Sequence, residues 1–248
     1  MKHSRVSGLF ISSAFLIFLS SCGGSGNEKA ASKDSAAADS SAKTTEVATP
    51  KSTVITTPEN LVIVTHKVAN YAKWKMGYDA HDSARLANGL HSYVIGRGLM
   101  DSNMIMVAMK CDDTAKAKAF SKDPSLKKVM EKAGVVGPPT MSFFTAVWQD
   151  TAIIDSKLRS RTMFSVKDWD AFQKAFMDGK QERMDNGITD RVVGHDWSDN
   201  KKVSLVTAIT DTAKAFAYYK SDALKKRREA GGVIGEPNRF LFRIVARY

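Results

Sequence analysis

The sequence contains few of the residues from which disulfide frameworks and metal sites are built. Of its 248 residues, only two are cysteine and five are histidine. Two cysteines cannot form a disulfide framework, and no two histidines have the His-Glu-x-x-His spacing of zinc hydrolases. A glycine-rich phosphate loop and a Gly-x-Ser-x-Gly nucleophile elbow are also absent. We therefore expect no metal site and no cofactor, and it stays open whether the protein is an enzyme.

Long apolar runs are scarce, and the one near the N-terminus is typical of an export signal. A short basic start, residues 2–5, precedes an apolar run from Val6 to Leu19. That run is too short to span ~30 Å of hydrocarbon as a helix, but it suits a secretory signal peptide. It ends in Leu19-Ser20-Ser21-Cys22, which resembles the bacterial lipobox.

The lipobox resemblance implies that a signal peptide over residues 1–21 is removed and that Cys22 then carries acyl chains such as palmitate. Several chains on one residue anchor a protein stably, because each buried methylene contributes roughly 0.8 kcal/mol. Gly23 follows in place of Asp, which by the same resemblance favours the outer membrane. We expect a lipoprotein of the bacterial cell envelope, facing the periplasm or the cell surface, with membrane lipid as its partner through Cys22.

Residues 22–60 are predicted to form a flexible tether. Small and polar residues dominate this segment, which has hardly any large apolar residue before Val54 and so cannot bury enough surface to offset chain entropy. The whole chain is 43% apolar and 25% charged, which is typical of a globular protein. The basic run Lys225–Arg228 is expected on a solvated helix face. We expect no nucleic-acid partner, because such a patch usually adds stacking aromatics and an exported protein rarely meets nucleic acid.

The strongest pattern is an internal repeat at a shift of 98 residues, without a gap. Matching segments include Asn88–Leu90 with Asn186–Ile188, and Asp113–Ala117 with Asp211–Ala215. Matches over this length indicate a duplication. We expect a first repeat over residues 61–150 and a second over residues 151–248.

Each repeat has the pattern strand, helix, strand, strand, helix, strand. The expected elements of the first repeat are a strand over 61–68, a helix from the N-cap Asn70 to about Ala87, strands over 91–98 and 103–111, helices begun by Asp113 and Asp123, and a strand over 141–148. Two strand–helix–strand units in this order form a ferredoxin-like sheet with both helices on one face.

The face of each predicted sheet that the helices leave open must also be buried. Met104–Met109 is apolar on both of its alternating faces, and a strand of this kind is covered on both sides. The simplest cover for the first repeat is the second. We therefore predict an α+β fold of two ferredoxin-like βαββαβ repeats, packed sheet to sheet as an intrachain dimeric α/β barrel. Such a pseudo-dimer needs no obligate oligomer.

Three segments of the first repeat, Tyr71–Arg85, Ala117–Phe120 and Gly134–Gly137, resemble small bacterial members of the dimeric α/β-barrel superfamily. That superfamily includes antibiotic-biosynthesis-monooxygenase-like domains. The resemblance implies the fold but little about activity, because this fold hosts cofactor-free oxygenases, haem enzymes, isomerases and plain binding proteins.

The first predicted helix carries the candidate catalytic residues. Its stripe facing the sheet is formed, at steps of three and four, by Tyr71, Trp74, Tyr78, His81 and Arg85. Two ionisable groups on such a stripe need partners or a wet cavity. His81 could act as a base or hydrogen-bond donor, and Arg85 could hold an anion. Alternatively the helix end frays into solvent, and Arg85 bonds carbonyl groups or a carboxylate.

Five residues are candidate ligand-binding positions: His66, Trp74, Tyr78, Met106 and Arg183. His66 is in phase with the apolar positions of its strand and is matched by Phe164, which suggests a core or pocket-wall position; a haem ligand is the alternative. Met106 belongs to a group of methionines that could line an adaptable cavity or fill a core. Arg183 is the repeat counterpart of Arg85.

Three classes of function remain. The first is a lipid-anchored envelope protein that binds a small apolar or aromatic molecule in a pocket of the barrel. The second is a cofactor-free monooxygenase or isomerase that uses His81 and Arg85. The third is a non-catalytic structural or interaction module whose pockets are filled by side chains. We favour the first, because no complete catalytic set is visible.

Overall fold

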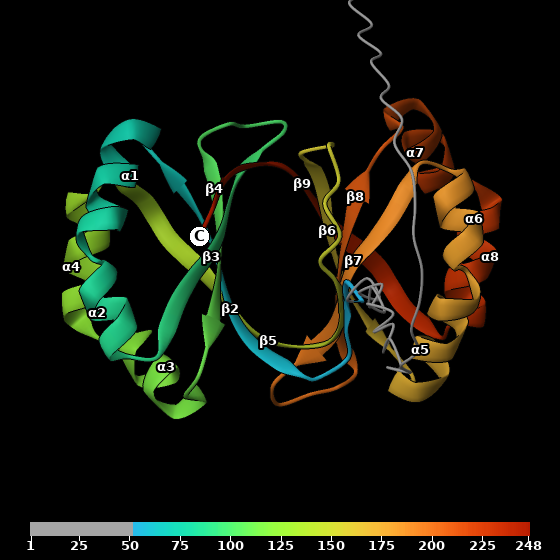
Figure 1. Cartoon of the computed structure of the whole chain (residues 1–248), viewed down its shortest axis with the longest axis horizontal. Coiled ribbons are helices and arrows are strands. Elements are labelled where there is room, and N and C mark those ends of the chain that lie inside the picture. Colours follow the sequence, from blue (N-terminus) through green and yellow to red (C-terminus); the bar gives the residue numbers. More distant parts are fainter. Residues whose placement is uncertain (1–51) are drawn as a thin grey trace, which may run out of the picture. The chain divides into compact units, whose positions relative to one another are not determined.

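The computed structural model describes residues 52–248, so the predicted signal peptide, the lipidation site Cys22 and most of the predicted tether lie outside the described residues. The described residues all lie in one compact unit. Figure 1 shows two curved sheets facing each other, with helices on the two outer sides. Over residues 52–248, the helices are all too short or too polar to cross a membrane.

The same order of elements occurs twice. The first half consists of β2 (Glu59–Val68), α1 (Tyr71–Ala80), α2 (Asp82–Ala87), β3 (Leu90–Gly98), β4 (Met104–Cys111), α3 (Thr114–Phe120), α4 (Pro124–Lys132) and β5 (Val135–Asp150). The second half consists of β6 (Leu158–Val166), α5 (Trp169–Asp178), α6 (Lys180–Asp185), β7 (Ile188–Asp196), β8 (Lys202–Ile209), α7 (Thr212–Tyr219), α8 (Asp222–Ala230) and β9 (Val233–Arg247). Each half is therefore the predicted βαββαβ unit.

A short strand precedes the first half. In β1 (Val54–Ile55), Val54 pairs with Asp150 and Ile55 with Gln149, at the end of β5. This strand lies within the segment for which composition predicts a tether. Its β-branched residues favour an extended backbone, and the end of β5 offers free pairing groups because β2 pairs with β5 only as far as Ala146.

The two four-stranded sheets close into one barrel, as predicted. The order is β5-β2-β4-β3 in the first half and β9-β6-β8-β7 in the second. Antiparallel pairing of β3 with β9 and of β5 with β7 joins the halves at both edges. Helices α1–α4 cover the outer face of one half and α5–α8 that of the other (Figure 1). The inner faces enclose the space that we call the lumen.

Strand β4 is buried on both faces, which confirms the prediction that this apolar strand is covered on both sides. Ile105 and Val107 belong to the core under the helices of the first half. Met106 and Ala108 belong to a second core inside the lumen. The fold therefore has apolar layers on both sides of the sheet, and each layer borders a different candidate binding space.

The first helical segment is broken, although its sequence predicts one helix from Asn70 to about Ala87. Asn70 caps α1 as expected, because its side chain accepts a hydrogen bond from the backbone of Lys73. At His81 the backbone leaves helical geometry, and α2 starts at Asp82. Gly179 breaks the second half at the matching place. Local helix periodicity continues through the joint, so the sequence pattern does not reveal it.

Strand β5 starts at Val135, six residues before the predicted Met141. Pro138 and Pro139 lie within it, although proline cannot donate to a strand ladder. They fall where the pairing with β2 shifts register, between the pairs Thr65–Thr140 and Lys67–Val136. A register shift is the position in a sheet that tolerates proline.

Two glycine–phenylalanine contacts close the barrel. Phe242 of β9 packs on Gly96 of β3, and Phe144 of β5 packs on Gly194 of β7. A Cβ atom at Gly96 would overlap the ring of Phe242. At Gly194 it would collide with the carbonyl oxygen of Thr145 and approach Phe144. Each half thus supplies the ring that fills the space left by a glycine in the other half.

Candidate functional site

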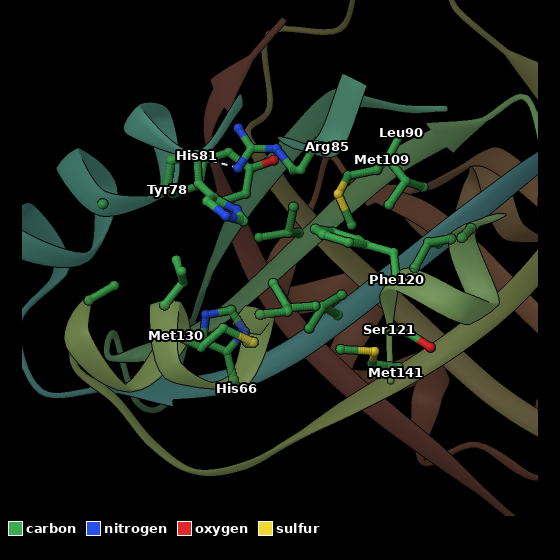
Figure 2. Close-up of a pocket in the computed structure, with 18 of the residues that line it drawn as sticks. His66, Tyr78, His81, Arg85, Leu90, Met109, Phe120, Ser121, Met130 and Met141 are labelled. Atoms are coloured by element: carbon green, nitrogen blue, oxygen red, sulfur yellow. Dashed lines mark hydrogen bonds between the residues drawn. The ribbon is translucent and has the colours of Figure 1, made fainter. Parts of the chain in front are cut away.

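Each half has a pocket between its helices and the outer face of its sheet. The first-half cavity, here the His66 pocket, has a volume of about 80 Å³. Figure 2 shows His66 and Met130 at one end of it, and His81 with Arg85 at the other. Its lining is otherwise mainly apolar and includes Val62, Val64, Trp74, Tyr78, Leu90, Val107, Met109, Phe120, Met130 and Met141.

Both ring nitrogens of His66 lack a hydrogen-bond partner in the described part of the chain, as does the buried Nε of Arg85 in the same pocket. His66 is 4% exposed. Its ring lies against Trp74 with centroids 5.4 Å apart. Burial lowers the pKa of His66 to about 4, so the imidazole is neutral at neutral pH. A neutral imidazole offers one N–H donor and one acceptor to whatever enters.

Arg85 is buried, and both of its terminal nitrogens donate hydrogen bonds, while its Nε lacks a partner in residues 52–248. It donates to the carbonyl oxygen of Tyr78 at 2.6 Å and to Asp82 at 2.8 Å, and its guanidinium stacks 3.7 Å from the centre of the Tyr78 ring. Arg183 makes the same contacts with the carbonyl and ring of Phe176. These contacts support the alternative prediction that Arg85 bonds carbonyl groups and a carboxylate, because the arginine caps the end of the preceding helix in both halves.

His81 lies at the helix joint and lines the same pocket. Its ring stacks on Phe120, with centroids 6.2 Å apart. Tyr78 exchanges a hydrogen bond with Ser92 at 2.7 Å, and burial raises the pKa of Tyr78. Trp74 stacks on Tyr78. The pocket therefore combines an aromatic wall with two imidazoles at opposite ends.

Two predicted ligand-binding residues lie elsewhere. Met106 points into the lumen and lines a cavity there, while Arg183 lines the second-half pocket. The sequence left open whether the halves share one pocket or hold two. Met106 faces away from the His66 pocket because successive strand residues face opposite sides of a sheet. Met109, Met130 and Met141 are the methionines that line the His66 pocket.

A wider groove adjoins the His66 pocket. It lies between the turn that joins α3 to α4, α4 itself and the start of β5, and has a volume of about 620 Å³. Ser121, Leu126, Met130 and Met141 line both spaces. The groove was missed from sequence because its wall depends on Pro138 and Pro139, which were expected to lie before the strand rather than inside it.

The second-half pocket has similar size but different chemistry. Its volume is about 90 Å³, and Phe164, Phe172 and Phe176 occupy the positions of His66, Trp74 and Tyr78. The hydroxyl groups of Tyr218 and Tyr219 are buried there without a partner in residues 52–248. Burial raises the pKa of Tyr218 to about 12, so this phenol stays protonated. Among the described residues, no group of three or more potential metal ligands occurs.

Two solved structures align with this chain over nearly the whole of their own length. A proposed monooxygenase of Fusobacterium nucleatum subsp. nucleatum is similar, with a TM-score of 0.50 and 12% identity over 76% of this chain and 93% of its own. An anthrone oxidase-like protein has a TM-score of 0.51 and 12% identity over 78% of this chain and 94% of its own. No family model matches the sequence, and no curated protein matches it. At this identity the likeness shows the fold alone, which is the α+β, ferredoxin-like fold of monooxygenase-like proteins.

Proposed function

We propose that the chain is a lipid-anchored envelope protein that binds a small apolar or aromatic molecule in the His66 pocket. The observation that carries this proposal is His66 itself, a buried imidazole with two unpaired nitrogens in a mainly apolar cavity. An unmade hydrogen bond of a buried polar group costs about 1–3 kcal/mol. A ligand with one hydroxyl, carbonyl or amide group would regain that free energy on binding.

The second half supports a binding role for this histidine. Phe164 stands at the matching position and packs against Phe172. The fold therefore accepts an apolar ring here, and the imidazole is not needed to build the core. The buried imidazole of His66 costs stability at a position where the second half carries phenylalanine. A role in contacting a ligand would explain why a histidine is present there.

The size of the space limits the ligand. The inner cavity of about 80 Å³ is well below the roughly 300 Å³ of an ordinary ligand pocket. Only a few non-hydrogen atoms fit beside His66, so the rest of the molecule would extend past Met130 and Met141 into the wider groove. Methionine side chains suit this role because they are flexible and polarisable.

The alternative of a cofactor-free monooxygenase or isomerase is less well supported. A general base works best when its pKa lies near the working pH, and the pKa of His66, at about 4, is far below neutral. The two terminal nitrogens of Arg85 already donate to Tyr78 and Asp82, which leaves only its buried Nε without a partner among the described residues. His81 remains the one candidate base among the residues that line the pocket. A structural module with filled pockets is the third alternative.

Haem chemistry does not fit the His66 pocket. His66 is the kind of residue that binds haem iron, and the superfamily resemblance includes haem enzymes. However, a cavity of about 80 Å³ that is bounded by Trp74 and Tyr78 is much smaller than a porphyrin. The adjoining groove is wider, but His66 is not among the residues that line it.

Native mass spectrometry of the full chain, purified in mild detergent from its own host, tests the proposal. We expect the measured mass to match a chain that begins at an acylated Cys22 and carries one small bound molecule. The variant His66→Phe, which installs the residue of the second half, should lose that molecule while Phe164→Leu retains it. Binding at this site would be contradicted if the wild-type mass were that of the acylated chain alone. It would also be contradicted if His66→Phe retained the molecule as well as the wild type does.

A further inference from the structure

A second cavity lies inside the barrel, on the opposite side of the sheet from the His66 pocket. It has a volume of about 80 Å³ and is bounded by both halves. The first half contributes an apolar wall that includes Leu61, Ile63 and Phe144. The second half contributes the arginines Arg159, Arg161, Arg191 and Arg247. The cavity is therefore apolar on one side and cationic on the other.

The internal repeat shows that the fold does not require these arginines. At a shift of 98 residues, the four arginines fall in order on Leu61, Ile63, Tyr93 and Gln149. All four of these uncharged residues line the same cavity from the other side. The positive charge is thus a property of one half and not of the barrel architecture.

The arginines lack enough acidic partners. Arg161 is 4% exposed, and its only hydrogen bond in the described residues runs from Nε to the hydroxyl of Ser204 at 3.2 Å. One terminal nitrogen of Arg191 is buried without a hydrogen bond, and Asp150 is 3.9 Å away from it. Arg159 donates only to backbone carbonyl groups. Asp150 is the one carboxylate among the cavity-lining residues.

The charge state of these arginines also favours an anionic ligand. Burial, followed by the charges of Arg191 and Arg247, lowers the pKa of Arg159 to about 10, and burial lowers that of Arg161 to about 10. Both remain cationic at neutral pH. Buried charges without a partner are costly, and an anion that enters would supply the missing partner. Arg247 is exposed, so the arginine end of the cavity reaches solvent.

We propose that the lumen binds a small organic carboxylate, whose carboxylate group is held by Arg159, Arg161 and Arg191. Arginine binds carboxylates through paired, charge-assisted hydrogen bonds. The apolar part of the ligand contacts Leu61, Ile63 and Phe144. An inorganic oxyanion would make no use of this wall, and an uncharged molecule would leave the arginines unpaired. The site is separate from the His66 pocket and does not depend on its function.

Binding of butyrate to the full chain in detergent tests this site. Nuclear magnetic resonance of arginine-labelled wild-type protein should show shifts of the Arg159, Arg161 and Arg191 Nε–H signals with butyrate. The shifts should be absent with 1-butanol, which has the same tail without the charge, and smaller with sulfate. Equal responses to butyrate and 1-butanol, stronger binding of sulfate, or no response at all would overturn the proposal.

Variants locate the site. Arg161→Ile installs the residue that the first half carries, and we expect it to weaken butyrate binding about tenfold or more, as for loss of a charge-assisted hydrogen bond. Arg243→Leu, which removes an exposed arginine of the same barrel, should bind butyrate like the wild type, as should His66→Phe. Unchanged affinity of Arg161→Ile would overturn the proposal. If that variant does not fold, the wild-type resonance shifts decide the question alone.

Discussion

At position 66 the first half carries an imidazole where the second half carries the ring of Phe164. The alternation of Val62, Val64 and Val68 along the strand predicted a core or pocket-wall position for His66, and the structure places its ring in the lining of the pocket. Sequence could not tell whether a neighbour would satisfy the ring, because partners of a strand residue come from elements far away in the chain. The structure supplies apolar neighbours only, and that makes the histidine a candidate site rather than a core residue.

The buried imidazole predicts a loss of stability in acid. Above pH 6.5 the ring is neutral in both the folded and the unfolded state. Between pH 6.5 and about 4, the unfolded chain binds a proton that the folded protein does not bind, because burial lowers the pKa of His66 in the fold to about 4. The free energy of unfolding should therefore fall by about 3 kcal/mol over this range.

Urea unfolding of the wild type and His66→Phe between pH 7.5 and pH 4 measures this loss. The variant should be at least as stable at pH 7.5 and should lose about 3 kcal/mol less on acidification. Other carboxylates titrate in both proteins alike and cancel in the comparison. Parallel curves for the two proteins would show that His66 is not kept neutral by the fold.

At the scale of elements, the two helix joints show what periodicity does and does not reveal. The steps of three and four from Tyr71 to Arg85 correctly placed one stripe against the sheet. The same steps concealed the break at His81, because the chain resumes a helix on nearly the same face. Arg85 was considered as an anion holder, yet both of its terminal nitrogens donate within its own helical segment and, within residues 52–248, only its Nε lacks a partner. Those short-range bonds depend on the break that periodicity could not show.

The two joints should differ in their dependence on arginine. Arg183 pairs with Asp190, whose side chain is 2% exposed, whereas Arg85 pairs with Asp82, whose side chain is 48% exposed. Arg183→Met leaves a buried carboxylate without a partner, which costs about 3–5 kcal/mol. Arg85→Met leaves a carboxylate that water can solvate, and we expect a loss of about 1 kcal/mol.

Thermal and denaturant unfolding of the two variants gives this comparison. The double variant Arg183→Met with Asp190→Ser serves as the control, since Ser92 occupies the matching position in the first half. It should recover most of the stability that Arg183→Met loses. Equal losses for the two single variants, or no recovery in the double variant, would refute the unequal roles of these arginines.

At the scale of the whole molecule, the closed barrel was predictable and the contents of its lumen were not. The 98-residue repeat and the two apolar faces of Met104–Met109 led to two sheets packed face to face. Arg159 and Arg161 escaped notice because alternating arginines on a strand normally indicate a solvent-exposed face. The signal was nevertheless present, since the repeat shift aligns them with Leu61 and Ile63.

The seams between the halves should be sensitive to a single methyl group. In Gly194→Ala the new Cβ would collide with the backbone oxygen of Thr145, which cannot move without breaking the β5–β7 pairing. We expect a loss of more than about 3 kcal/mol, above the usual range for overpacking. For Gly96→Ala the three atoms nearest to the new Cβ all belong to the side chain of Phe242, and we expect a cost of about 1–3 kcal/mol.

Chemical denaturation, followed by circular dichroism, ranks these variants. Gly235→Ala is the reference, because no atom lies within 4 Å of its added Cβ and only its φ of +69° opposes the change, at about 1 kcal/mol. The stability order should be Gly235→Ala, then Gly96→Ala, then Gly194→Ala. A Gly194→Ala protein as stable as the reference would show that the seam is looser than these contacts indicate.

The joining of both sheets in one polypeptide has a consequence for the lumen. An assembly of two identical subunits repeats every substitution across its twofold axis, so an arginine on one wall would face a second arginine on the other. Here Arg161 corresponds to Ile63 across the pseudo-twofold. Covalent fusion thus lets each wall evolve alone and gives the interior a polarity, so that an anionic guest would be held in a single orientation.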